Sequence, residues 1–336
     1  MVRIGQLVLT VLVTWFIVNR VGLGMAQLQN VDASAWIPSA LPFLAASALL
    51  LAAYFLSAAI WGEIVHDLGG PRLLIRDSVQ LFMIANLGRY LPGKVWQMAG
   101  LAALAQTRGV PVRTGTGAAV LGQGLALVAA AGVGTLALLS GPDNLRPLGF
   151  VGSVGIGVVV VLIGIPRVFN ALAVRWFRLA RSEFPVGLGS AHGLRWLGLY
   201  ALNWVMYATS FWGLCMSLGL EGAILPVSSA FAAAYVLGYL MIFAPAGLGP
   251  REGFLMALLT PQFGVASSGM IAIVARLWTT IVEVIPAGLF WMRYLREIRG
   301  AIADFSLSCL PTTRLRTSRG RFLRSWHRTP VCTCWW

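Results

Sequence analysis

The sequence predicts an all-α polytopic membrane protein with about six full membrane spans, two re-entrant helical hairpins and an inverted repeat. Three observations lead to this fold class: the apolar composition, the lengths of the apolar runs, and the distribution of arginine among the loops. Of the 336 residues, 58% are hydrophobic and only 11% are charged, whereas soluble domains carry about 25% charged residues. We therefore exclude a soluble protein.

Six apolar runs approach or exceed the ~20 residues that a helix needs to cross a bilayer. The expected spans are Ile4–Val21, Ser39–Trp61, Thr114–Leu139, Leu148–Ile165, Leu194–Leu218 and Gly269–Trp291. Two further apolar regions, Ser78–Thr107 and Pro226–Gln262, are interrupted by proline, glycine and charged residues. Because proline and glycine disfavour a continuous helix, we expect a broken backbone in both regions.

The arginines of the loops predict how the two interrupted regions run. Three loops carry two, two and five arginines, namely Gly62–Asp77, Arg108–Arg113 and Pro166–Arg195. If both interrupted regions crossed the membrane, Arg108–Arg113 would lie outside. If both dip in and return, all arginine-rich loops lie in the cytoplasm, as the positive-inside rule favours. This solution places both termini in the cytoplasm and makes the two hairpins enter from opposite faces.

Two broken segments that enter from opposite faces are typical of an inverted-repeat transporter with a site near the membrane midplane. Irregular backbone at membrane depth is tolerated where it lines a cavity or is buried in protein. We therefore expect the tips of the two hairpins to face each other across a polar cavity.

The net charge of +14 comes mainly from arginines in loops and in the C-terminal region. Such positive loops meet the anionic cytoplasmic leaflet, so we expect no nucleic-acid partner. We divide the chain into a transmembrane domain, residues 1–302, and a basic, disordered cytoplasmic tail, residues 303–336. The expected location is the inner (plasma) membrane.

The sequence shows no spacing of cysteine and histidine that is typical of a zinc site. It also shows no catalytic or nucleotide-binding motif in a supporting context. We therefore expect no metal, no cofactor and no enzymatic activity.

The first break carries two cations, Arg89 and Lys94, on either side of Pro92-Gly93. Lys94 is the only lysine in the chain. Lysine supplies a compact charge and arginine a planar fork that suits phosphate oxygens, so the two side chains could contact a lipid headgroup. The alternative is a pair of cations at a helix end that extend toward the membrane surface. Pro92 ends the helix and Gly93 permits a tight reversal.

The second break contains Pro245, Gly247 and Gly249, after which Arg251 and Glu252 open the next helical piece. The free backbone N–H groups of a helix N-terminus attract anions. Arg251 would strengthen this attraction, and Glu252 could offset or orient Arg251. The alternative is a charged extracellular loop.

The last expected span contains two ionisable residues, Arg276 and Glu283. Seven residues separate them, so they share a helix face about 10 Å apart. Ionisable groups within a span usually face a cavity or a partner. Arg276 could bind Glu252, and Arg89 could bind Glu283; buried pairs with a purely structural role are the alternative.

At these positions the chain resembles the lysylphosphatidylglycerol synthase transmembrane-region family of flippase-like membrane proteins. The resemblance rests on Gly88–Trp96, Pro245–Gly253 and Arg276-Leu277 and covers roughly residues 1–300, with Ala246 and Pro250 as departures. It implies a function in moving lipids between leaflets. The implied partner is an anionic or zwitterionic membrane lipid or a polyprenyl-phosphate-linked substrate.

The resemblance makes a lipid flippase or transporter the leading functional hypothesis. Bifunctional members carry an aminoacyltransferase domain, but nothing after Ala301 is long or apolar enough to form one, so we expect no lysyl transfer. One alternative is a non-transporting accessory protein of a cell-envelope lipid or glycan pathway, with a homo-oligomer or a biosynthetic partner. Another is a membrane-embedded transferase with Glu252 or Glu283 as its base.

Overall fold

The computed structural model describes residues 37–90, 95–140, 146–179, 187–241 and 249–308, and these parts of the chain are helical apart from short connections. The predicted all-α class is confirmed. The predicted span Ile4–Val21 lies outside the described residues. The helices are α3 (Ala40–Asp67), α4 (Ile75–Asn86), the 3-10 turn η2 (Leu87–Tyr90), α5 (Val95–Gln106), α6 (Val112–Leu139), α7 (Arg146–Gly164), α8 (Pro166–Leu179), α9 (Ser190–Ser217), α10 (Ile224–Leu240) and α11 (Pro250–Ser308).

The chain divides into two compact units, residues 1–294 and residues 295–336. The first unit contains the helices α3 to α10 and most of α11. In the second unit, α11 continues through Ser308, past the predicted domain boundary at residue 302. The remainder of the predicted tail, residues 309–336, lies outside the described residues.

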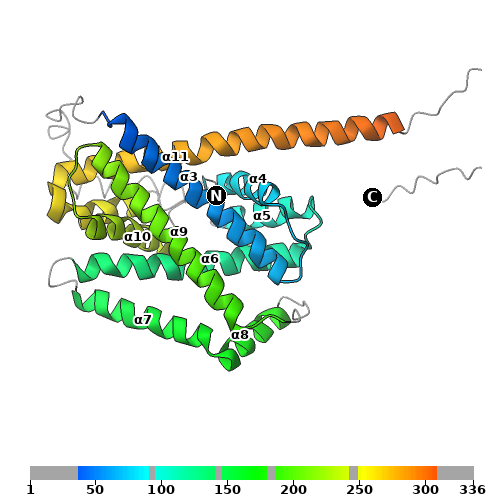
Figure 1. Ribbon diagram of the computed structural model, residues 1–336, viewed down its shortest axis with the longest axis horizontal. Coiled ribbons are helices and arrows are strands. Elements are labelled where there is room, and N and C mark those ends of the chain that lie inside the picture. The colour runs from blue at the N-terminus through cyan, green and yellow to red at the C-terminus, as the bar shows by residue number, and fades with distance from the viewer. Residues whose placement is uncertain (1–36, 91–94, 141–145, 180–186, 242–248, 309–336) are drawn as a thin grey trace, which may run out of the picture. The chain divides into compact units, whose positions relative to one another are not determined.

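Helices α3 and α9 lie side by side in antiparallel orientation (Figure 1). At one end, the backbone N–H of Ser39 donates to the carbonyl of Ser217 over 2.7 Å. At the other end, Asp67 accepts hydrogen bonds from Arg195, at 2.5 Å, and from the indole of Trp196, at 2.9 Å. The two helices are therefore paired along nearly their whole length.

Two hydrophobic clusters are built on this helix pair. One joins α3 and α9 to α4, α10 and α11 and includes the buried side chains of Met83, Phe211 and Leu259. The other joins α3 and α9 to α4, α5 and α6 and includes Trp61 and Trp196. The first cluster takes in parts of both interrupted regions and the second packs mainly against the first of them, so the α3–α9 pair contacts both regions.

Helices α4 and α5 form the first hairpin. At its tip, the Gln97 amide donates to the Asn86 side chain over 2.6 Å. At its base, Arg108 contacts both Gln80, at 3.3 Å, and Asp77, at 3.2 Å. The two helices are therefore antiparallel. Each has 12 residues and is about 18 Å long, which is shorter than the ~30 Å hydrocarbon core of a bilayer.

Helix α10 and the first limb of α11, residues 250–263, form the second hairpin. A Cβ atom at Gly238 would lie 2.7 Å from the Cβ of Arg251, and one at Gly222 would lie 2.7 Å from the ring of Phe263. These contacts place the end of α10 beside the start of α11, and Gly222, in the connection that leads into α10, beside the end of the limb. Gly264 then breaks α11 with a φ of 74°.

Among the described residues, three helices are long and apolar enough to cross a membrane: α3, α6 and the Pro250–Arg299 part of α11. The bent pair of α7 and α8 would make a fourth. Helix α9 matches the predicted span Leu194–Leu218 and has 28 residues, but it is less apolar and does not meet the same criterion. These helices make the chain a multi-pass membrane protein.

The predicted cytoplasmic loop Pro166–Arg195 begins with a helix, α8, and ends within another, α9. Helix α8 is bent by 84° from α7 and carries Arg167, Arg175 and Arg178. A helix perpendicular to a membrane span lies in the membrane plane, where arginines meet the lipid headgroups. The bend occurs at Pro166, whose ring disfavours a helical conformation of the preceding residue.

We predict that Gly134→Ala destabilises the protein and that Gly124→Ala on the same helix does not. A Cβ atom at Gly134 would lie 2.8 Å from the backbone of Ala233 on α10, whereas one at Gly124 meets nothing within 4 Å. Overpacking of this kind costs about 1–3 kcal/mol. Replacing an unhindered helical glycine by alanine instead stabilises a helix by about 0.5–1 kcal/mol. Thermal unfolding of the purified variants measures the difference, and equal midpoints would contradict the close approach of α6 and α10.

Candidate functional site

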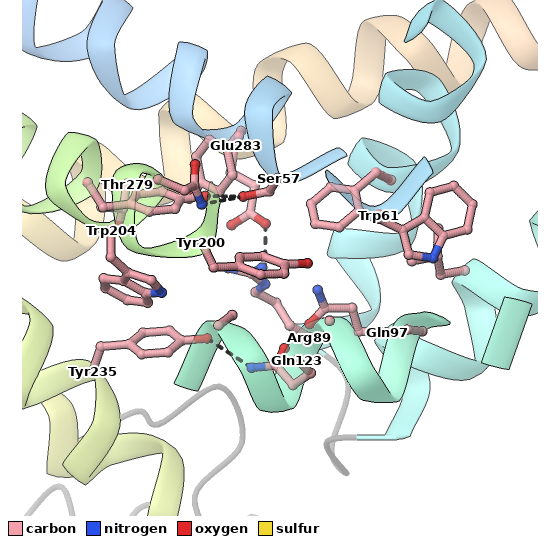
Figure 2. Close-up of a pocket in the computed structure, with 18 of the residues that line it drawn as sticks. Ser57, Trp61, Arg89, Gln97, Gln123, Tyr200, Trp204, Tyr235, Thr279 and Glu283 are labelled. Carbon is pink, nitrogen blue, oxygen red and sulfur yellow. Dashed lines mark hydrogen bonds and ion pairs between the residues drawn. The ribbon is translucent and has the colours of Figure 1, made fainter. Parts of the chain in front are cut away.

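A cavity of about 100 Å³ lies within the first unit, between the two hairpins. Its lining comes from η2 and from α3, α4, α5, α6, α9, α10 and α11. Space of this size holds several water molecules. Figure 2 shows that charged, amide and aromatic side chains converge on it. Residues of both interrupted regions line this cavity, whereas the breaks at residues 91–94 and 242–248, whose tips are predicted to face each other, lie outside the described residues.

Glu283 connects the first hairpin to α11. The side chain of Glu283 is only 2% exposed, and its Oε1 lies 3.3 Å from the Nε of Arg89. The hydroxyl of Tyr90 donates to the other carboxylate oxygen over 2.9 Å. The turn η2 brings both partners to the tip, since Gly88 packs against the backbone of Trp96 so closely that a Cβ would lie 3.0 Å from it. One carboxylate therefore holds the tip of the first hairpin.

Glu252 connects the second hairpin to the same helix. The start of α11 has proline at its first position, and the backbone N–H of Gly249 donates to Glu252 over 2.7 Å. This is the glutamate half of a capping box, which satisfies an otherwise unpaired N–H. The other carboxylate oxygen of Glu252 lies 3.8 Å from the Nε of Arg276. Arg276 also lies 5.9 Å from the ring centre of Tyr90 and so touches both hairpins.

Arg251 differs from the other arginines of the cavity in its partners. Its guanidinium lies 4.9 Å from the ring centre of Phe231 and 5.8 Å from that of Tyr235. Among the described residues, no carboxylate lies within 4 Å of it. The rings attract the cation but do not neutralise its charge. Arg251 is therefore available to an anion in the cavity.

Aromatic side chains form one wall of the cavity. The ring centres of Tyr54 and Tyr207 lie 5.4 Å apart, those of Tyr207 and Trp204 5.3 Å, and those of Trp204 and Tyr235 4.6 Å. Figure 2 shows Tyr200, Trp204 and Tyr235 around the polar groups. Such rings combine a flat apolar surface with a hydroxyl or N–H group that can take part in a hydrogen bond.

The structure brings together four residues that the sequence identified: Arg89, Arg251, Arg276 and Glu283 all line the cavity. Glu252 and Gly249 adjoin it through the contacts just described. Both ion pairs that the sequence suggested, Arg276 with Glu252 and Arg89 with Glu283, are present. The other predicted site residues lie outside the described parts of the chain: Pro92, Gly93, Lys94, Pro245 and Gly247.

Sequence reasoning missed the neutral part of the site. Gln97, Gln123 and Asn203 line the cavity together with the tyrosines of its aromatic wall. Amide side chains inside the predicted apolar regions could have indicated these residues, because an amide within a membrane span is costly unless it faces a partner or a cavity.

We predict that Glu283→Ala lowers stability strongly, by about 3–5 kcal/mol, because it leaves Arg89 in the interior without its acidic partner. Adding Arg89→Ala should recover part of this loss. Denaturant or thermal unfolding of the two single variants and the double variant gives the coupling.

Glu63→Ala is the control for this cycle. Glu63 pairs with Arg195, and both side chains are 48% exposed, so its removal should cost only about 0–1 kcal/mol. Strictly additive losses for Arg89→Ala and Glu283→Ala would show that the two charges do not stabilise each other.

Comparison with known proteins identifies the family of the chain. Residues 3–287 match the family model described as the lysylphosphatidylglycerol synthase TM region. A search of curated proteins finds no match. The matched range covers most of the chain, including α3 to α10 and the part of α11 that carries Arg276 and Glu283. The chain belongs to the lysylphosphatidylglycerol synthase transmembrane-region family.

Proposed function

We propose that this protein moves a phospholipid or a lipid-linked glycolipid between the two leaflets of the membrane. The observation that carries the proposal is a cavity in which both hairpins meet, with Arg89 from one and Arg251 from the other. Arginine forks suit the phosphate oxygens of a lipid headgroup. The acyl chains would stay in the surrounding lipid while the headgroup passes through the protein.

The energetic cost of placing charged side chains inside the membrane supports a functional role for this site. Charged side chains at membrane depth are expensive and are retained mainly at pathways for substrates or ions. The lining includes three arginines and one glutamate. It takes in the short helices α4 and α5, which cannot cross a bilayer alone, as well as long helices such as α3 and α6. Paired broken segments of this kind hold the substrate site in several transporter folds.

Both hairpins form ion pairs with the same limb of α11, and in the proposed transport cycle these ion pairs open and close in turn. Glu283 binds the first hairpin and Arg276 binds Glu252 of the second. Seven residues separate these positions, or about 10 Å along the helix. Release of one ion pair while the other persists would open the cavity toward one side of the membrane. Alternation between the two states would carry the headgroup across.

The same contacts argue against a transferase. A general base needs a carboxylate that can reach a substrate proton. Glu283 is engaged by Arg89 and Tyr90, and Glu252 by Arg276 and the backbone of Gly249. We therefore propose a transporter without catalytic activity.

We predict that the purified protein accelerates exchange of fluorescent phospholipids between the leaflets of liposomes. Arg251→Ala and Lys94→Ala should each slow this exchange at least tenfold, because each removes a proposed headgroup contact. Arg72→Ala, an exposed loop arginine, is the matched control and should leave the rate unchanged. Transport at the unaltered rate by both site variants would overturn the assigned site.

We also propose that the protein resides in the inner (plasma) membrane with both termini in the cytoplasm and with hairpins that enter from opposite faces. A single cysteine introduced in the Arg108–Arg113 loop should then react with an impermeant reagent only from the cytoplasmic side. A cysteine replacing Glu221, in the connection between α9 and α10, should react from outside. External labelling of the first position would contradict the double re-entrant arrangement.

A further inference from the structure

The charge of the cavity is uneven. Arg89 is paired with Glu283, and Arg276 with Glu252. Arg251 contacts two aromatic rings and, among the described residues, has no carboxylate within 4 Å. A cation removed from water in this way is costly unless an anion compensates it. Among the described residues, the arginines of the site therefore outnumber its carboxylates by one, and Arg251 is the arginine left without an acidic partner.

Two neutral side chains of the cavity lining also have polar atoms without a hydrogen-bond partner among the described residues. Asn203 is 1% exposed and lines the cavity; its amide donates to the hydroxyl of Ser57 over 2.8 Å. Its carbonyl oxygen has no hydrogen-bond partner among the described residues. The indole N–H of Trp61, also in the lining, has none either. Because buried polar groups are nearly always satisfied, a ligand or water must supply both a donor and an acceptor.

Gln123 adds a third polar contact. Its amide nitrogen approaches the hydroxyl of Tyr235 at 3.5 Å, the long limit of a hydrogen bond. Figure 2 shows the side chains of Tyr235 and Gln123 pointing toward each other and joined by a dashed line. The amide retains a donor and a carbonyl oxygen for a ligand. Hydroxyl groups are the ligand groups that both donate and accept, so they match this lining.

The lining disfavours a cationic headgroup. An ammonium or choline group needs a carboxylate or an open aromatic face. The two carboxylates at the site, Glu252 and Glu283, are already paired with arginines. Arg251 lies against the rings of Phe231 and Tyr235 and would repel a second cation.

We infer that the cavity recognises an anionic phosphate ester that carries a polyhydroxylated group, as in an inositol or sugar phosphate. Arg251 binds the phosphate, Asn203 and Gln123 bind hydroxyls, and the aromatic wall packs against the carbon skeleton. This inference rests on the proposed function, which supplies the lipid that bears the headgroup. It goes further by replacing a general anionic or zwitterionic lipid with one headgroup class.

Binding to the full-length protein in detergent tests the inference without transport. Four lipids with identical acyl chains separate the features: phosphatidylinositol has both phosphate and hydroxyls, phosphatidic acid only the phosphate, a glucosyl diacylglycerol only the hydroxyls, and phosphatidylcholine a cation. Native mass spectrometry or ligand-induced thermal stabilisation should rank phosphatidylinositol at least tenfold above each of the others. Phosphatidylcholine should bind most weakly.

Two substitutions should each remove one half of this preference. Arg251→Gln should abolish the advantage of phosphatidylinositol over the glucosyl lipid, since the phosphate loses its cation. Gln123→Leu should abolish the advantage over phosphatidic acid, since the hydroxyls lose an amide. Arg72→Gln, at an exposed loop position, is the control for the first, and Gln123→Ala repeats the second with a smaller side chain. Each variant must retain the unfolding midpoint of the parent within a few degrees.

Equal binding of phosphatidylinositol and phosphatidic acid by the parent protein would overturn the role of hydroxyls. Preference for phosphatidylcholine would overturn the inference entirely. Water-soluble glycerophosphoinositol carries the same headgroup without acyl chains, so it distinguishes a lipid ligand from a soluble one. Weak competition by this compound for the site supports a lipid ligand. Competition as strong as that of phosphatidylinositol would overturn the assignment of a lipid. Selective binding without any lipid exchange would contradict only the proposed function, and exchange without headgroup preference would contradict only this inference.

Discussion

The carboxylate of Glu283 is the contact on which the arrangement of the cavity depends. Hydrophobic burial gives little direction inside a bilayer, because lipid tails are as apolar as the side chains they surround. A short helical hairpin therefore needs polar contacts to fix its tip. Glu283 supplies them, since one oxygen faces Arg89 and the other accepts from Tyr90. Without this carboxylate, the tip would carry a cation into the protein with nothing to orient it.

The second hairpin is also held by an ion pair to the long limb of α11, but the acidic and basic partners are exchanged. Here the hairpin contributes the acid, Glu252, and α11 contributes the base, Arg276. Both attachments lie on one helical limb, which also packs against α3 through Trp278, whose indole donates to Ser47 over 2.9 Å. In the proposed cycle, a phosphate that enters the cavity competes with Glu283 and Glu252 for their arginines. The headgroup would thus loosen the contacts that keep the cavity closed.

The sequence predicts the charged part of this site well, because proline and glycine inside an apolar region are conspicuous and because Arg276 and Glu283 are costly inside a span. It predicts the neutral part poorly. Tyr54, Tyr207 and Trp204 look like ordinary residues of a membrane helix, and only the pairing of α3 with α9 turns them toward one cavity. Likewise, the connection between the interrupted region Pro226–Gln262 and the expected span Gly269–Trp291 reduces to a single break at Gly264, since helix is retained on both sides of it.

Local helix geometry gives the adjacent residues Arg251 and Glu252 different partners. Adjacent helix residues point about 100° apart, so the two cannot share one partner easily. Glu252 turns back to the N–H of Gly249 and across to Arg276, as its position in the capping box requires. Arg251 consequently points to α10, where Gly238 permits close packing and two rings receive the guanidinium. A cation left beside an occupied carboxylate is the feature that a phosphate-bearing substrate would complete.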